Sequence, residues 1–344
     1  MTRKLAWTVG LTAVSAAATV LALVGTRPDA HAQDAIELKI ATVAPEGTPW
    51  EKQLRNFKRY VEEGSQGRVK VKMFMGGALG GEKALVRRTQ QGSLQCFAGS
   101  TGALGTAVAE LNVIEAPYLF SSFEQADRAL DSQAVRTAVA SAVQRAGFQF
   151  GFWAENGFRS WFTKERPIRL PADMRGLRMR SQEALVHLET YRAVGASPVP
   201  IDVTNVLTSL QTGVVDGFDN SLLFAFAASW YQGARQLNVS QHSYQPGIVV
   251  YSKSWFDGLP ADVKRILTEV PTAMVTDGRA AVRRMEPILL RNLERYGIQV
   301  HQPTPEERAQ FVQATRQVAD RVAGKSGRGG RELLRALRAG AAGG

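Results

Sequence analysis

The chain has 344 residues, of which 42 are Lys or Arg and 31 are Asp or Glu, and its formal net charge is +11. This length predicts about two domains, and an apolar fraction of 44% excludes a disordered chain. The single cysteine, Cys96, excludes an internal disulfide, a zinc cluster built on cysteines and an iron–sulfur site.

Residues 1–32 have the pattern of a secretory signal peptide. A basic start, Met1–Lys4, precedes the apolar run Leu5–Gly25, and Ala30–Ala32 provides the small residues of a cleavage site. We therefore expect a mature protein that begins near Gln33, is periplasmic and does not insert into the membrane. A retained N-terminal anchor is the alternative.

The basic excess is concentrated at the two ends of the chain. The leader contributes part of it, and residues 324–344 contain five basic residues and one glutamate. The remaining body is only mildly basic and has no nucleic-acid-binding motif, so we expect no nucleic-acid partner. The composition of the Gly/Arg-rich tail, residues 324–344, predicts a poorly ordered segment that aids solubility.

In the first half of the chain, strand-like and helix-like segments alternate. Ile36–Val43 and Arg68–Phe74 have strand patterns, and Pro49–Gly64 has apolar residues at intervals of three and four. Glu82–Gln91 is a second predicted helix, and Leu94–Ala98 is a third predicted strand. This order favours α/β layers around a largely parallel sheet.

The second half repeats the alternation and ends in helices. The predicted strands are Phe148–Trp153, Phe158–Phe162, Gly176–Ser181, Pro198–Ile201 and Gly247–Lys253. The predicted helices between them are Glu183–Val194 and Val203–Thr212. From Pro260 to Tyr296 the pattern is helical, and Pro271 and Pro287 are expected to kink or divide it.

These elements predict two α/β domains that are joined by crossings of the chain. The predicted division is domain I over residues 33–155, completed by residues 245–260, domain II over 156–244, a long kinked helix spanning both over 260–297, a C-terminal helix over 304–323 and the tail over 324–344.

The common catalytic and cofactor motifs are absent from the sequence. It has no G-x-S-x-G elbow, no H-E-x-x-H pair and no G-x-x-x-x-G-K-[ST] loop. His187 and Glu189 match only the start of a zinc-deaminase signature, whose cysteine half cannot form with one cysteine. We therefore expect no enzyme activity, no cofactor and no metal. An enzyme of unrecognised type remains the less favoured alternative.

Two segments bring polar residues to predicted strand ends. Arg178 and Arg180 fall on one face of the strand that follows Gly176, and Asp219 and Asn220 end the short strand after a helix capped by Gly213. Crevices outside such strand ends bind ligands in open α/β sheets. A guanidinium there can pair with a carboxylate through two parallel hydrogen bonds. For Arg180, a structural salt bridge to Asp173 or Asp219 remains an alternative.

The ordered segments resemble the solute-binding subunits of TRAP (tripartite ATP-independent periplasmic) transporters, the DctP family. The resemblance covers nearly all of the mature chain and rests on LKIATVAPEGTPW, GRVKVKMF, GGALGGEK, APYLF, ADMRGLRMR, GASPVPI and LQTGVVDGFDN. It implies a two-domain periplasmic-binding-protein-like fold with a ligand cleft between the domains and a long domain-spanning C-terminal helix. It also implies capture of a small organic acid and its delivery to integral membrane permease subunits.

The resemblance also implies a set of ligand-binding residues. The hallmark carboxylate-binding arginine of the family falls on Arg180, and an auxiliary arginine falls on Arg159, with one residue more than usual between them. The family's asparagine falls on Asn220, and the end of its first-domain strand falls on Gly99, Ser100 and Thr101. Asn156, which begins the segment of Arg159, completes the predicted site.

Two positions depart from the family pattern. Ser221 stands where a proline often follows the asparagine, and Val203 stands where sialic-acid binders place an aromatic over the ligand. A sugar-acid ligand is therefore not carried over, and the identity of the organic acid stays open. The alternative to transport is a periplasmic sensor that presents the bound acid to a receptor. Neighbouring genes for integral membrane subunits would favour transport over sensing.

Overall fold

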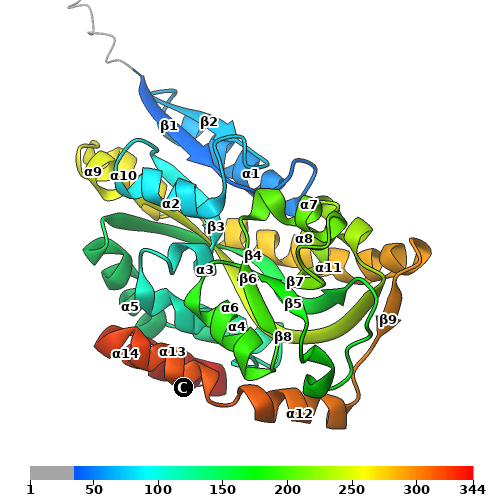
Figure 1. Cartoon of the computed structure of the whole chain (residues 1–344). Coiled ribbons are helices and arrows are strands. Elements are labelled where there is room, and N and C mark those ends of the chain that lie inside the picture. Colours follow the sequence, from blue (N-terminus) through cyan, green and yellow to red (C-terminus); the bar gives the residue numbers. More distant parts are fainter. Residues whose placement is uncertain (1–34, 344) are drawn as a thin grey trace, which may run out of the picture. The chain divides into compact units, whose positions relative to one another are not determined.

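The computed structural model of the chain describes residues 35–343, and the predicted signal peptide, residues 1–32, lies outside the described residues. Nine strands of the described residues form one mixed sheet (Figure 1). They are β1 (Ile36–Ala41), β2 (Val69–Phe74), β3 (Cys96–Ser100), β4 (Phe148–Thr163), β5 (Arg178–Ser181), β6 (Ser197–Pro200), β7 (Gly217–Ser221), β8 (Gln236–Ser252) and β9 (Gln299–His301).

The strand order is β2-β1-β3-β8-β4-β7-β5-β6, and β9 pairs with β8. The three strands of the first half, β2-β1-β3, are parallel, and so are β7-β5-β6 of the second half. Between the halves, β8 and β4 are antiparallel to each other, β8 is antiparallel to β3, and β4 is antiparallel to β7. The prediction of a largely parallel sheet is correct for each half and wrong for the centre.

Helices cover both halves of the sheet. The α-helices are α1 (Pro49–Gly64), α2 (Glu82–Gln90), α3 (Thr101–Leu104), α4 (Phe123–Asp131), α5 (Gln133–Arg145), α6 (Leu185–Ala193), α7 (Val206–Gln211), α8 (Leu222–Ala227), α9 (Lys253–Asp257), α10 (Ala261–Thr268), α11 (Thr272–Arg295), α12 (Pro305–Thr315), α13 (Val318–Lys325) and α14 (Gly327–Ala342). Short 3₁₀ turns are η1 (Ala109–Glu115), η2 (Pro171–Met174), η3 (Val203–Asn205) and η4 (Trp230–Gly233).

Helix α1 shows how local sequence produces an element and its packing. The Thr48 hydroxyl accepts a hydrogen bond from the backbone N–H of Glu51, and Pro49 occupies the first helical position, where a missing N–H costs nothing. The predicted apolar side, which includes Leu54 and Phe57, is buried against the first half of the sheet.

The two long central strands, β4 and β8, run through the predicted domain boundaries, and the boundary residues of the two strands lie beside each other in the sheet. Glu155 of β4 pairs with Pro246 of β8, and the β4 register shifts by a bulge between Glu155 and Gly157. Instead of two separate strands, Phe148–Thr163 is one continuous strand, and β8 begins eleven residues before the predicted Gly247. The described residues form one compact unit, and the division at residues 155 and 244 stays a prediction.

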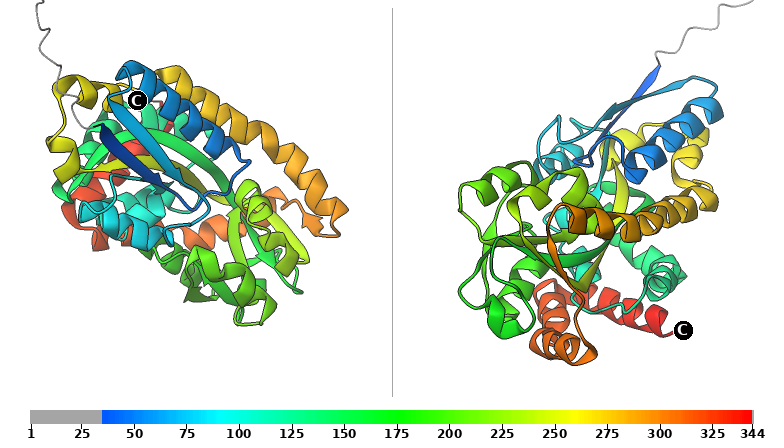
Figure 2. Two further views of the ribbon diagram at one scale, coloured as in Figure 1. Left: turned by 90° about the horizontal axis from the view of Figure 1, so that it is seen from above. Right: turned by 90° about the vertical axis from the view of Figure 1, so that its right-hand side faces the viewer.

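The predicted long helix over residues 260–297 is divided at Pro271 into α10 and α11. Pro287 lies inside α11, and the helix, which is 24 residues long, is not divided there. Helix α11 packs against α1, β4 and α8, and Figure 2 shows α1 and α11 side by side. It therefore lies across both halves of the sheet.

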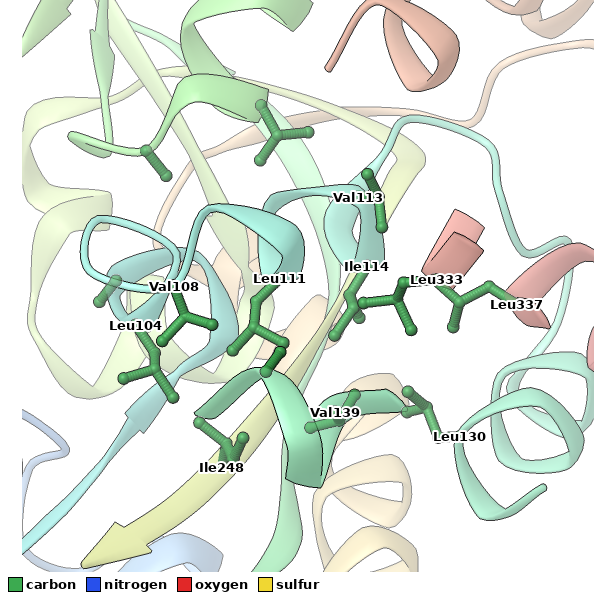
Figure 3. Close-up of a cluster of buried hydrophobic side chains, with 14 of the residues drawn as sticks. Leu104, Val108, Leu111, Val113, Ile114, Leu130, Val139, Ile248, Leu333 and Leu337 are labelled. Carbon is green, nitrogen blue, oxygen red and sulfur yellow. The ribbon is translucent and has the colours of Figure 1, made fainter. Parts of the chain in front are cut away.

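The prediction of a poorly ordered tail over residues 324–344 is wrong for the described part. Gly327–Ala342 form the helix α14, whose Leu333 and Leu337 are buried beside Ile114 and Leu130 (Figure 3). Apolar residues spaced for one helix side outweigh the Gly/Arg composition. Gly340 serves packing, because a Cβ added there would lie 2.8 Å from Ala129 Cα of α4. The predicted helix over 304–323 is likewise two helices, α12 and α13.

Candidate functional site

A cavity of about 610 Å³, partly open to solvent, lies where strands from both halves of the sheet end. Gly99 and Ser100 reach it from the end of β3, Arg180 from β5 and Asn220 from β7. Glu155 and Asn156 reach it from the bulge in β4. Of the predicted site residues, all but Thr101 line this cavity.

Arg180 presents an unpaired guanidinium to the cavity. Its side chain is buried, its Nε donates to the carbonyl of Ile201 at 3.0 Å, and its guanidinium carbon lies 5.0 Å from the centroid of the Trp230 ring. Its two Nη atoms have no hydrogen-bond partner within residues 35–343, and no described carboxylate forms an ion pair with it. Burial, with the nearby charge of Arg159, lowers the pKa of Arg180 to about 10.

The two alternative acidic partners of Arg180 are engaged elsewhere. Asp173 Oδ2 accepts the backbone N–H groups of Arg169 and Leu170 at the start of η2, each at 2.8 Å. Asp219 pairs with Arg159. The structural salt bridge that the sequence left open for Arg180 is therefore not formed.

Arg159 is fixed by protein groups on all sides. Its Nε donates to Asp219 Oδ2 at 2.6 Å, its Nη2 to the carbonyl of Asp219 at 2.7 Å, and its Nη1 to Gln245 Oε1 at 2.8 Å. Tyr191 donates its hydroxyl to Asp219 Oδ1 at 2.6 Å. The ion pair is almost fully buried, with both side chains 1% exposed.

His242 completes this buried group in its neutral form. Burial lowers the pKa of His242 to about 4, so the ring is neutral near pH 7. Since a carboxylate only accepts hydrogen bonds, Nε2 carries the proton that is donated to Asp219 Oδ2 at 3.3 Å. Burial alone would raise the pKa of Asp219, but the Arg159 charge and the His242 hydrogen bond hold it well below its usual value.

An amide network orients Asn220 toward the cavity. Its Oδ1 accepts from Asn156 Nδ2 at 2.9 Å and from the Ser221 N–H at 2.8 Å. Asn156 Nδ2 also donates to Gln245 Oε1 at 2.6 Å, and Asn156 Oδ1 accepts from the Ser221 hydroxyl. Because its oxygen is occupied, Asn220 is left with Nδ2, a donor that has no partner among the described residues.

Glu82, at the start of α2, is a site residue that the sequence prediction omitted. Its Oε1 accepts the Ser100 N–H at 2.7 Å, and its Oε2 accepts the Ser100 hydroxyl and Gln182 Nε2, each at 3.0 Å. Burial, with some repulsion from Glu115, raises the pKa of Glu82. The signal was present, because Glu82 is the acidic residue of the GGALGGEK segment on which the resemblance rests.

The end of β3 contributes less directly than predicted. Gly99 lines the cavity because it has no side chain, since a Cβ there would lie 2.6 Å from Glu82 Oε1. The Ser100 hydroxyl accepts from the Ala103 N–H and so caps α3. Thr101 lies behind the cavity wall, where its hydroxyl donates to Glu115 Oε1 at 2.6 Å.

Trp50, Val203 and Gln245 also line the cavity. The resemblance placed Val203 where some relatives cover the ligand, whereas Trp50 and Gln245 were not among the predicted site residues. Gln245 lies in the polar segment of β8 over residues 240–245, where apolar alternation no longer marks a strand. The described residues contain no group of three His, Cys, Asp or Glu side chains that could hold a metal ion. Within residues 35–343, no helix is long and apolar enough to cross a membrane. The cavity thus offers a guanidinium fork, amide donors and two carboxylates, Glu82 and Glu155, of which Glu155 is paired with Arg283.

Comparison with known proteins places these residues in a family. Residues 40–326 match the DctP family, described as bacterial extracellular solute-binding protein, family 7. The C4-dicarboxylate-binding periplasmic protein DctP of Rhodobacter capsulatus is 28% identical over 321 residues, which are 93% of each chain. A solute-binding protein of Verminephrobacter eiseniae is 34% identical over 205 residues, which are 60% of this chain and 61% of that protein.

Two solved structures share the fold. The sugar acid binding protein DctPAm of Advenella mimigardefordensis, in complex with galactonate, is 26% identical and superposes with a TM-score of 0.82 over 88% of this chain and 98% of that one. A TRAP periplasmic solute-binding protein of a Polaromonas species, bound to D-erythronate, is 29% identical with a TM-score of 0.81 and the same coverage. Both likenesses extend over nearly the whole of the solved chains.

Proposed function

Because the chain belongs to the bacterial extracellular solute-binding proteins of family 7, the DctP family, we propose that it captures a small organic acid and delivers it to TRAP permease subunits in the membrane. The family consists of binding proteins, and the chain is a non-enzymatic component of transport. The observation that carries the choice of ligand is the unpaired guanidinium of Arg180 in a cavity of about 610 Å³.

In the proposed complex, the ligand carboxylate lies between Arg180 and Asn220. The two Nη atoms of Arg180 donate to the two carboxylate oxygens, and Asn220 Nδ2 donates to one of them. A buried guanidinium without a counter-ion is unfavourable, so a ligand carboxylate that supplies the missing charge is strongly selected over a neutral molecule. Arg159 supports the site by fixing Gln245 and Asp219.

Glu82 extends the proposal to the remainder of the ligand. Its carboxylate only accepts hydrogen bonds while ionised, so it favours a ligand that donates a hydroxyl and disfavours a second carboxylate beside it. The galactonate and D-erythronate complexes of two relatives support a hydroxy acid. Sequence analysis did not carry over a sugar-acid ligand because of Val203. With Glu82 in the cavity, a sugar acid becomes the favoured ligand class, and C4-dicarboxylates are the second choice.

The location and partners of the chain are part of the same proposal. Relatives such as the Rhodobacter capsulatus protein are periplasmic binding proteins, which supports export of this chain. The predicted cleavage after Ala32 lies outside the described residues. Intact-mass analysis of a periplasmic extract tests it, and a full-length product in the membrane fraction contradicts it.

A thermal-shift screen tests the ligand. Aldonates, C4-dicarboxylates and 2-oxo acids are compared with the matched polyols, which lack the carboxylate. A binding acid at 100 times its Kd should stabilise the protein by about 2.7 kcal/mol, and the polyol should leave it unchanged. The proposal is contradicted if an acid and its polyol stabilise the protein equally. It is also contradicted if none of the acids stabilises the protein.

A further inference from the structure

Helix α14 lies beyond residues 40–326, the part of the chain that matches the family. Its inward side is fixed, because Leu333, Leu334 and Leu337 are buried in the same cluster as side chains of η1, α4 and α5 (Figure 3). The outward side of α14 is therefore held in a constant orientation.

The outward side of α14 is an arginine face, which we define as Arg328, Arg331, Arg335 and Arg338. All four are exposed, and their spacing of three, four and three residues places them within a sector of about 80° around the helix axis. They extend over roughly 15 Å of the helix. Three of them also line a surface hollow of about 660 Å³.

The charges of the arginine face are only weakly neutralised. Arg328 pairs with Glu332 and Arg338 with Asp320, and these exposed pairs compete with water. Arg331 has one long contact, 3.5 Å to the carbonyl of Gly324, and Arg335 has no hydrogen-bond or ion-pair partner among residues 35–343. Four guanidiniums with this freedom attract a surface that carries many anions.

We propose that the arginine face docks the protein on an anionic phospholipid surface. One guanidinium group can donate two parallel hydrogen bonds to the oxygens of one phosphate. A row of basic residues is also attracted to anionic lipid headgroups when it lies within a Debye length of the membrane surface. The large apolar side chains that are exposed in the described residues are Val214, Ile288, Tyr296 and Val312, and none of them lies on α14. The centres of protein–protein interfaces are depleted of charged residues other than arginine and enriched in aromatic ones, whereas an anionic lipid surface attracts a basic face by charge alone.

Docking through α14 does not use the residues of the cavity. The residues that line the cavity all precede α9, and Figure 1 and the right-hand view of Figure 2 place α14 at the opposite side of residues 35–343 from β1 and β2. The inference therefore does not depend on the identity of the bound acid. Where the protein serves a membrane transporter, such docking would confine its search for the permease to the membrane surface.

Helix α11 provides a matched control. Arg284, Arg291 and Arg295 are also exposed on one helix side, but the exposed acids Asp277 and Glu294 lie on the same helix. The test variant R328Q/R331Q/R335Q and the control R284Q/R291Q/R295Q each remove three charges by the same substitution. Glutamine is a good helix former, so both helices should persist.

Vesicle sedimentation is the measurement. The wild-type protein and both variants are mixed with vesicles of phosphatidylcholine alone or with about one third phosphatidylglycerol. One arginine near such a surface contributes about a fivefold change in partitioning, so the α14 variant should lose at least about tenfold in binding to the anionic vesicles and the α11 variant less than about threefold. About 0.5 M salt should abolish wild-type binding.

Three outcomes overturn the proposal. They are no wild-type binding to the anionic vesicles, equal losses in the two variants, and tighter binding of the face to duplex DNA or an acidic peptide than to vesicles at equal salt. Unchanged thermal melting of both variants shows that the fold is intact. The thermal shift caused by the acid should be the same in the α14 variant as in the wild-type protein. Vesicle binding and acid binding are thus measured separately, so a failure of docking can be told apart from a failure of the proposed ligand site.

Discussion

Two buried arginines line the same cavity and have opposite surroundings. Arg159, on β4, is satisfied by Asp219 and Gln245, and the Asp219 charge raises its pKa in spite of burial. Arg180, on β5, has one hydrogen bond to a carbonyl and no carboxylate partner, and burial lowers its pKa to about 10. Residue type and depth of burial are the same, and the contacts differ.

The difference separates a structural role from a binding role. An ion pair that is complete within the protein contributes to folding and has little left to offer a ligand. A buried guanidinium with an open fork costs folding free energy, which a ligand carboxylate recovers when it binds. The following substitutions test this separation of Arg159 from Arg180.

Arg159→Ala should have the largest effect. It leaves the buried carboxylate of Asp219 without its counter-ion, and we expect the free energy of unfolding to fall by about 3–5 kcal/mol. Urea denaturation without ligand measures it. Stability close to that of the wild-type protein would show that the Arg159–Asp219 pair is not structural.

Arg180→Ala should affect binding and not folding. We expect a loss of about 2–5 kcal/mol in binding of the acid, with ligand-free stability unchanged or raised, because an uncompensated buried charge is removed. Arg180→Lys keeps the charge, loses the planar fork and should also bind substantially more weakly. Calorimetric titration and urea denaturation together decide, and a stability loss as large as that of Arg159→Ala would abolish the distinction.

Glu82→Gln should change selectivity and pH dependence. The pKa of Glu82 is raised in the folded protein, so the folded state binds the proton more tightly and wild-type stability falls as pH rises from about 4.3 through the raised pKa. The variant should lack this contribution. Its affinity for a hydroxy acid should fall by about 1 kcal/mol relative to that for a dicarboxylate. An unchanged ratio of the two affinities would place Glu82 outside the ligand contacts.

Arg178→Ala should have the smallest effect. Its side chain is 51% exposed and pairs with Asp216 at 2.7 Å on the surface. We expect a change of less than about 1 kcal/mol in stability and no change in affinity. Because Arg178 lies two residues from Arg180 on the same strand, it controls for the loss of a positive charge. An affinity loss like that of Arg180→Ala would contradict the assignment of the site.

Local patterns of the sequence determined where several site residues stand. Apolar periodicity and turn residues located β1, α1, β2, α2 and the strands that end near Arg180 and Asn220, because these features depend on residues close together in the chain. The family resemblance then pointed to Arg180, which lines the cavity, and its role in binding stays a prediction. The GGALGGEK segment contained Glu82, although its position in the cavity was not apparent from the sequence.

Only the tertiary structure decided which arginine is paired. Asp219 lies 60 residues from Arg159, and Gln245 lies 130 residues from Glu115, to which it donates a hydrogen bond. Hydrophobic periodicity reports the burial of apolar side chains, whereas a buried polar group is stabilised by partners that the fold brings from distant segments. For the same reason the polar half of β8 was missed, and α14 became a packed helix because its leucines meet η1 and α4.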